Sequence, residues 1–275
     1  MEINFERNTF TKRLTSMLRV DFRRMFTMPL LYIFLLSSIA MPVLILVMTT
    51  MMDGTVSVNP QTGVETVTEG FDNVWQIIGT VSSSSAVNAG ASDAAAAMSL
   101  TSMCNMNMMY FIISVLVCIF VADDFRSGYS KNLFTVRAEK SDYVISKTLV
   151  CFAGGALMLF AFFIGSLLGG AISGLPFTMD GFNSFNLVAC VLSKIILAGV
   201  FVPIYLTMSV IAKQRLWLSV LLSLGVGMLL YMMIPMLTPL DSGFGNPVIC
   251  LIATVLLSAG LGSVSNIILK KTALV

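Results

Sequence analysis

Histidine is absent from the 275 residues of the chain, and charged residues are scarce. The lack of histidine excludes metal sites with imidazole ligands, Ser-His-Asp and Cys-His triads, and histidine proton relays. The cysteines form no C-x-x-C pair and lie in or beside apolar runs. No disulfide framework is therefore predicted, and the cysteines are interpreted as small buried apolar residues. They are Cys104, Cys118, Cys151, Cys190 and Cys250.

Charged residues make up 11% of the chain, less than half of the roughly 25% found in ordinary soluble domains. Hydrophobic residues make up 57%, and the mean hydropathy is +0.91. About 20 consecutive, mostly apolar residues cross the hydrocarbon core of a bilayer, and the sequence contains several such runs. The composition therefore predicts an integral membrane protein.

Hydropathy and turn signals predict an all-α membrane protein with six transmembrane helices. The first apolar run is too long for the core of a signal peptide, so we expect it to be retained. The spans are expected at residues 30–52, 101–122, 144–172, 186–212, 216–235 and 248–269. Residues 1–29 would form an interfacial helix, and residues 30–275 the membrane domain.

The positive charges predict the orientation of the chain. Fifteen of the 16 lysines and arginines fall on one side when the N-terminus is placed inside. The opposite loops carry acids but no Lys or Arg, and the remaining cation, Lys194, lies within or at the edge of the fourth span. By the positive-inside rule, we expect both termini and the polar segment at 123–147 to lie in the cytoplasm.

The N-terminal segment at residues 9–29 has the pattern of an amphipathic helix. Its acid Asp21 falls on the apolar face, where we expect it to pair with Arg24 or with a cytoplasmic partner. A generic membrane anchor and a helix that docks a specific protein both fit this pattern. The apolar face holds Phe10, Leu14, Met17, Leu18, Phe22 and Met25, opposite Lys12, Arg19 and Arg23.

The external loop at residues 53–100 is polar and contains no catalytic or metal-binding constellation. Residues 53–72 are rich in turn formers, and residues 80–99 are rich in Ala and Ser and could form a short surface helix. We interpret the loop as a polar cap on the membrane domain.

Small residues at four-residue spacing occur in two of the predicted spans. They include Gly165 and Gly169 in the third span and Ser258 and Gly262 in the last span. Such faces allow helices to approach closely, either within one subunit or across a dimer. Pro42 and Pro203 fall inside spans and are expected to kink them, since proline lacks a backbone donor. 

The chain lacks the sequence motifs of ATPases, intramembrane proteases and gradient-driven transporters. It has no G-x-x-x-x-G-K-[ST] phosphate-binding loop and no cytoplasmic segment long enough to fold as an ATPase. Its spans contain no pair of acids for intramembrane proteolysis or gradient coupling. Any active transport would therefore draw its energy from a separate protein.

A polar cassette, "FVADDFRSGYSKNLFTVRAEKSDY" at residues 120–143, separates the second and third spans. It resembles the first cytoplasmic loop of the type-2 ATP-binding-cassette (ABC) export permeases. There an acid and an aromatic residue end the second span, and a glycine turn, a basic residue and a short apolar helix follow. The resemblance covers about 25 residues in pattern and most of the chain in architecture. It departs at Tyr129, where threonine is more usual, and in the length of the external loop.

The resemblance implies that the chain is the permease subunit of an ABC exporter in a bacterial cytoplasmic membrane, without catalytic residues of its own. Two cytoplasmic ATPase subunits would bind ATP and Mg, and a second permease copy or paralogue would complete the complex. The cytoplasmic coupling loop at 123–143 would carry a coupling helix at about 129–136, seated in a groove of the ATPase. The implied docking residues are Asp123, Asp124, Phe125, Gly128, Lys131, Leu133, Phe134 and Arg137.

The residue types suit such a docking role. Leu133 and Phe134 could bury apolar surface, while Lys131 and Arg137 could steer the partner. Asp123 and Asp124 would precede the helix, where carboxylates favour its N-terminus. Gly128 would allow the turn out of the second span. A solvated basic loop that only satisfies the positive-inside rule is the alternative.

A possible substrate path begins at the outer end of the second span, at Asn105, Met106 and Asn107. Lys194 is added to this path, although it would reach the outer interface by snorkelling if the fourth span began near Ser193. Thioethers suit Cu(I), but a lipid-like, drug-like or peptide-like substrate, or plain packing, is preferred. No metal or cofactor is predicted in this chain, and the partners include membrane lipid but no nucleic acid.

Two other functions remain open from the sequence. One is a membrane scaffold or sensor that uses the same loop to bind a cytoplasmic protein. The other is a secondary multidrug carrier that uses Lys194 and an unrecognised acid.

Overall fold

The computed structural model describes residues 10–58, 65–67, 70–81, 105–136, 140–179, 181–213, 215–231 and 233–271. Over these residues the chain is predominantly helical, which confirms the predicted class. Five of its helical segments are long and apolar enough to cross a membrane. They comprise α2 (Pro29–Met52), α5 (Met109–Arg126) with the preceding 3₁₀ turn η2 (Met106–Met108), α7 (Lys140–Ser173), α8 (Ser184–Ala212) and α11 (Gly245–Lys271).

The predicted fifth span is shorter in the structure than expected. Helix α9 (Leu216–Tyr231) has 16 residues and is followed by the one-turn helix α10 (Ile234–Leu237). Pro235 stands at the start of α10 and has no N–H to continue the preceding helix. The predicted segment 216–235 is thus divided between two helices.

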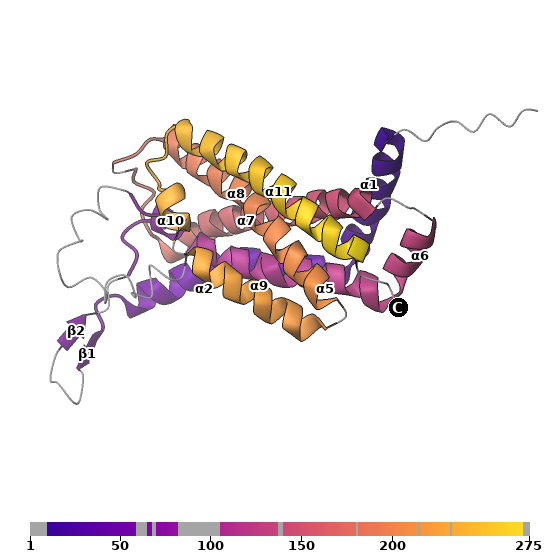
Figure 1. Ribbon diagram of the computed structural model, residues 1–275. Coiled ribbons are helices and arrows are strands. Elements are labelled where there is room, and N and C mark those ends of the chain that lie inside the picture. Colours follow the sequence, from indigo (N-terminus) through magenta and orange to yellow (C-terminus); the bar gives the residue numbers. More distant parts are fainter. Residues whose placement is uncertain are drawn as a thin grey trace, which may run out of the picture.

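The bundle has two distinct ends, which Figure 1 shows at opposite sides of the view. Helices α1 (Phe10–Thr27) and α6 (Tyr129–Val136) lie at one end, together with the last turn of α11; we call it the α6 end. The opposite end carries α10 and the strands β1 (Val56–Val58) and β2 (Glu65–Val67); we call it the hairpin end. The 3₁₀ helix η1 (Val74–Ile77) follows the hairpin in the sequence.

The hairpin is a departure from the predicted all-α fold. Strands β1 and β2 pair antiparallel, with Val56 opposite Val67. The sequence "VSVNPQTGVETV" places β-branched residues on both sides of a turn-rich stretch, as β-hairpins require. The surface helix expected within 80–99 lies almost wholly outside the described residues.

Helix α8 forms the centre of the bundle, and α11 lies at its periphery. In its most apolar window 78% of the α8 residues are buried, against 11% for α11. Helix α11 packs along α8 through Thr254 and Ser258, whose hydroxyls donate to the carbonyls of Ile196 (2.9 Å) and Gly199 (3.3 Å). Pro203 lies inside α8 as expected, and the Thr207 hydroxyl donates to its carbonyl.

The small-residue face of the third predicted span packs within the chain, against α2. A Cβ added at Gly165 would lie within 3.0 Å of the Ile39 backbone and of the Pro42 ring, and one at Gly169 would lie 2.9 Å from the Val43 Cα. Because real Cβ atoms do not approach backbone so closely, only glycine allows α2 and α7 to pack at this distance. 

The close approach of α2 and α7 predicts the effect of a single added methyl group. Gly165→Ala should destabilise the protein by about 1–3 kcal/mol, because the new Cβ would meet the α2 backbone. Gly260→Ala in α11 is the matched control, since a Cβ there meets no heavy atom within 4 Å. Thermal unfolding of both variants in the same detergent measures the difference. Equal melting temperatures would contradict the packing described here.

Candidate functional site

A cluster of buried charges joins three helices at the α6 end. The Lys147 ammonium lies 2.9 Å from Asp21 Oδ1 and 2.6 Å from Asp124 Oδ2, and all three side chains are completely buried. Arg24 Nη1 lies 2.5 Å from the second oxygen of Asp124. We call Asp21, Arg24, Asp124 and Lys147 the charge cluster. Its two cations balance its two anions.

Hydroxyl groups of α7 complete the coordination of both carboxylates. The Tyr143 hydroxyl donates to Asp124 Oδ2 at 2.9 Å, and the Ser146 hydroxyl donates to Asp21 Oδ2 at 2.6 Å. Removing a carboxylate from water is costly unless charge and hydrogen bonds compensate, and both are supplied here. Because Asp21 belongs to α1, Asp124 to α5 and Lys147 to α7, the cluster fixes these helices relative to one another.

The α1–α7 contact extends beyond the cluster. Arg13 Nε lies 3.3 Å from Asp142 Oδ2, one turn before Ser146 on α7. Met17 and Met25 of α1 are also buried. Part of the apolar face predicted for α1 therefore packs against the bundle, although Phe10 is exposed, and Arg19 and Arg23 on its other face are exposed as well.

Helix α6 contacts the charge cluster through aromatic rings. The Arg24 guanidinium lies 4.1 Å from the centroid of the Tyr129 ring, at the first residue of α6. The Phe134 ring packs edge-on against Tyr143 at 5.4 Å, and Tyr143 itself binds Asp124. Burial is the largest single influence and works to lower the pKa of Arg24, but the charge and hydrogen bond of Asp124, together with smaller contributions from Tyr129 and Asp21, raise the pKa overall. Arg24 thus stays charged, and its cation–π contact persists.

Helix α6 occupies the residues expected for the coupling helix, with a glycine turn before it. Gly128 has φ +73°, a left-handed conformation that glycine adopts without a steric penalty. Lys131, Asn132 and Thr135 are exposed, whereas Leu133 and Phe134 are partly buried against the bundle core. The outer face of α6 is therefore polar, and its apolar residues partly face the protein's own core.

The structure corrects the expected positions of two acids. Asp123 and Asp124 lie in the last turn of α5, and do not precede α6 directly. Asp124 is buried in the charge cluster, and the next residue, Phe125, is also buried, so neither can contact a partner protein. Asp123 is exposed. Asp21 pairs with Lys147 where Arg24 was expected, because Arg24 reaches across to Asp124. Arg137 lies outside the described residues.

Lys147 and Tyr143 are functional candidates that the sequence reasoning missed. In the sequence, Lys147 contributes only to the positive charges that predict the orientation of the chain. A buried acid on the apolar face of α1 needs a cation, and Lys147 is the basic residue of α7 that supplies it. The sequence signal that could have pointed to such a cation was the position of Asp21 on the apolar face of the predicted helix.

A second polar site surrounds Lys194, toward the hairpin end. Its ammonium donates to Asn107 Oδ1 at 2.5 Å and to Thr238 Oγ1 at 3.0 Å. The Tyr110 hydroxyl donates to the Lys194 carbonyl at 2.8 Å. Lys194 is completely buried, and α8 begins ten residues before it, at Ser184, so the condition for snorkelling, a span that begins near Ser193, is not met. It does not reach water because Asn107 and Thr238 accept its hydrogen bonds inside the protein.

The structure brings only some residues of the predicted substrate path into contact. Asn107 and Lys194 touch, and Met106 is buried in the same turn. The Asn105 side chain accepts from the Asn107 N–H at 3.0 Å and so caps the η2 turn. A role of these residues in transport stays a prediction.

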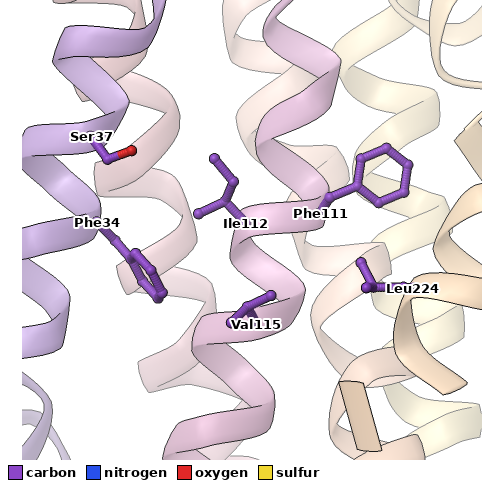
Figure 2. A pocket seen from close by; sticks show the side chains of 6 residues that line it. All are labelled: Phe34, Ser37, Phe111, Ile112, Val115 and Leu224. Carbon is purple, nitrogen blue, oxygen red and sulfur yellow. The ribbon is translucent and has the colours of Figure 1, made fainter. Parts of the chain in front are cut away.

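An apolar groove of about 350 Å³ runs between α2, α5 and α9. Figure 2 shows Phe34 and Ser37 on one side, Ile112 and Val115 in the middle, and Phe111 and Leu224 on the other side. Ser37 is the one polar side chain of this lining, so the groove suits an apolar chain. The described residues contain no group of three or more His, Cys, Asp or Glu that could hold a metal ion.

Comparisons with models of known protein families, with curated proteins and with solved structures give no match. 

The charge cluster predicts a strong dependence of stability on Lys147. Lys147→Met leaves Asp21 and Asp124 buried without their shared cation, and should cost about 3–5 kcal/mol of unfolding free energy. The same substitution at the exposed Lys270 should have little effect. Unfolding in detergent measures both.

A double substitution separates the ion pair from general packing. Asp21→Asn combined with Lys147→Met should cost less than the sum of the single changes, because each removes the charge that the other leaves unpaired. Additive losses would show that the two side chains are not energetically coupled.

Proposed function

We propose that the chain is the membrane-spanning permease subunit of an ABC transporter, powered by a separate cytoplasmic ATPase. The resemblance of residues 120–143 to type-2 ABC export permeases supports this assignment. Export of an amphipathic or hydrophobic substrate, such as a peptide, a drug or a lipid-like molecule, follows from the same resemblance.

The observation that carries the proposal is the position of α6. It is a short helix between two long apolar helices, and its first residue stacks on Arg24 of the charge cluster. A helix held in this way can transmit a displacement to α1, α5 and α7, since all three meet at Lys147. Such a transmission element is what a permease driven by an external ATPase requires.

The docking surface consists of the exposed residues at and beside α6. Asp123, Arg126 and Lys131 present charges to the solvent, and Asn132 and Thr135 add polar groups. Charges at the edge of an interface steer the partner and set its register. Leu133 and Phe134 support the helix from its inner side.

The proposed topology has six spans, with α9 as the fifth span in chain order. At about 1.5 Å per residue its 16 residues cover roughly 24 Å, most of a hydrocarbon core of about 30 Å. The α6 end, which carries α1 and the basic end of α11, would face the cytoplasm of a bacterial cell. Helix α1 would lie in that interface with Arg19 and Arg23 toward anionic headgroups.

The nucleotide chemistry belongs to the partner in this proposal. ATP and Mg would bind to two ATPase subunits, and the chain itself would contribute no catalytic residue. A second permease copy or a paralogue would complete the membrane domain. 

A proton-coupled carrier is the second candidate, and the buried position of Lys194 favours it. An ionisable residue within a span is typical of such carriers. No carboxylate of the described residues lies within 4.0 Å of Lys194, however, so the expected acid partner is not among them.

Purification in mild detergent tests the proposal against this candidate. The complex should contain an ATPase subunit in constant proportion, and reconstituted vesicles should hydrolyse ATP. A chain that purifies alone and moves substrate on a proton gradient without ATP would refute the proposal.

The charge of the α6 surface should determine ATPase binding. Lys131→Glu should lower co-purification of the ATPase by about tenfold, since it reverses a charge on the proposed interface. Lys271→Glu makes the same change on an exposed residue of α11 and should leave co-purification unchanged. If both variants retain the ATPase equally, α6 is not its docking site.

A further inference from the structure

Lys194 differs from the other cations of the protein in its position. Among the lysines and arginines that the structure describes, it alone lies away from the α6 end. It follows Ser184, the first residue of α8, by ten residues, or roughly 15 Å along the helix axis. A hydrocarbon core is about 30 Å thick, so Lys194 lies deep in the proposed membrane region.

Lys194 also lacks the counter-charge that Lys147 has. Lys147 contacts two carboxylates, whereas the partners of Lys194 among the described residues are an amide and a hydroxyl, both neutral. An ammonium group buried without an opposite charge is costly, and an anion is the partner that relieves this cost.

The two hydrogen bonds of Lys194 leave one of its N–H donors available for another acceptor. An ammonium group has three N–H donors, and two of them are used, toward Asn107 and Thr238. Thr238 Oγ1 donates its own proton to the Ile234 carbonyl at 2.9 Å, so it can only accept from Lys194. An anionic oxygen would supply both the third acceptor and the missing charge.

The start of α5 adds a second positive pole to the same place. Asn107 lies two residues before the first residue of α5, and Tyr110 in its first turn binds the Lys194 carbonyl. The N-terminus of an 18-residue helix carries a partial positive charge and attracts anions. The Lys194 ammonium and the N-terminus of α5 thus lie close together, and none of the described acids forms an ion pair with Lys194.

The side chains around Lys194 are apolar and buried. Met106, Met109, Cys190 and Cys250 are all buried in this region of α5, α8 and α11. The segment after α10 closes it toward the hairpin end, where the Leu240 N–H donates to the Thr80 carbonyl at 2.9 Å.

We propose that Lys194, Asn107 and the start of α5 form a binding site for the anionic group of an amphipathic molecule, a carboxylate or a phosphate. The inference rests on the proposed function only in treating this molecule as the transported substrate. Binding itself is a property of this chain and does not depend on an ATPase.

Photolabelling of the full chain in phosphatidylcholine nanodiscs tests the site. The probes are a diazirine-bearing dodecanoate and its methyl ester, which differ in charge but share the acyl chain. Mass spectrometry should find the acid on peptides containing Asn107 or Lys194 at least about tenfold above the ester, because a charged hydrogen bond contributes about 1.5–3 kcal/mol.

Three variants isolate the charge of Lys194. Lys194→Gln retains a donor for Asn107 and Thr238 but has no charge, and should reduce labelling by the acid to the level of the ester. Lys194→Arg should retain the preference for the acid. Lys270→Met removes an exposed cation of α11 and should change nothing. Gel filtration and thermal unfolding identify any variant that is misfolded.

Replacing part of the phosphatidylcholine by phosphatidylglycerol identifies the source of the anion. Competition would assign the site to a lipid headgroup, and undiminished labelling would assign it to a free amphipath. Equal labelling by the acid and the ester, or an unchanged preference in Lys194→Gln, overturns the anion site. Because no ATPase is present, this result is independent of the test of the proposed function.

Discussion

The ion pairs of Lys147 with Asp21 and Asp124 are the interaction on which the architecture of the α6 end depends. All three side chains are completely buried, so none of them can be satisfied by water. Each acid comes from a different helix, and Lys147 comes from a third. A displacement of α1 or α5 would separate opposite charges in a region of low dielectric, where such a separation is costly. The three helices therefore move together or the cluster rearranges as a whole, and α6 is attached to it through Tyr129 and Phe134.

The two buried lysines illustrate opposite solutions to the same physical problem. Lys147 is neutralised within the chain and serves as a fixed connection between helices. Among the described residues Lys194 has only neutral partners, and it lies between interrupted elements, the η2 turn and the segment after α10. Interrupted helices are typical of binding sites in transporters, because their exposed polar backbone needs a ligand or a protein partner. The proposed account thus places energy input at the α6 end and substrate recognition nearer the hairpin end.

The sequence predicted most of the long helices, because an apolar run of about 20 residues in a membrane has few alternatives to a helix. The boundaries were less predictable. Helix α7 begins at Lys140, before the expected residue 144, because Asp142 and Tyr143 bind groups of other helices and are buried. A hydropathy profile treats such polar residues as loop. The hairpin was missed because strands of three residues give little periodic signal.

The short helix at the α6 end was predicted from the sequence, but the contacts of the charge cluster were not. Gly128 and a helix at 129–136 followed from the turn signal and the resemblance. The pairing of Asp21 with Lys147 and that of Arg24 with Asp124 could not follow from local patterns, because each joins residues 100 or more positions apart. The departure from the family pattern at Tyr129 gains a physical explanation, since its ring covers the Arg24 guanidinium.

Hydrogen–deuterium exchange of the purified complex, with and without the ATPase subunits, tests the central claim most directly. If α6 is the point at which the ATPase drives the membrane domain, amides of residues 129–136 should exchange more slowly when the ATPase is bound. Segment 70–81, which follows the hairpin, should show no direct protection. Unchanged exchange in α6, with protection confined to a segment outside α6, would contradict the account.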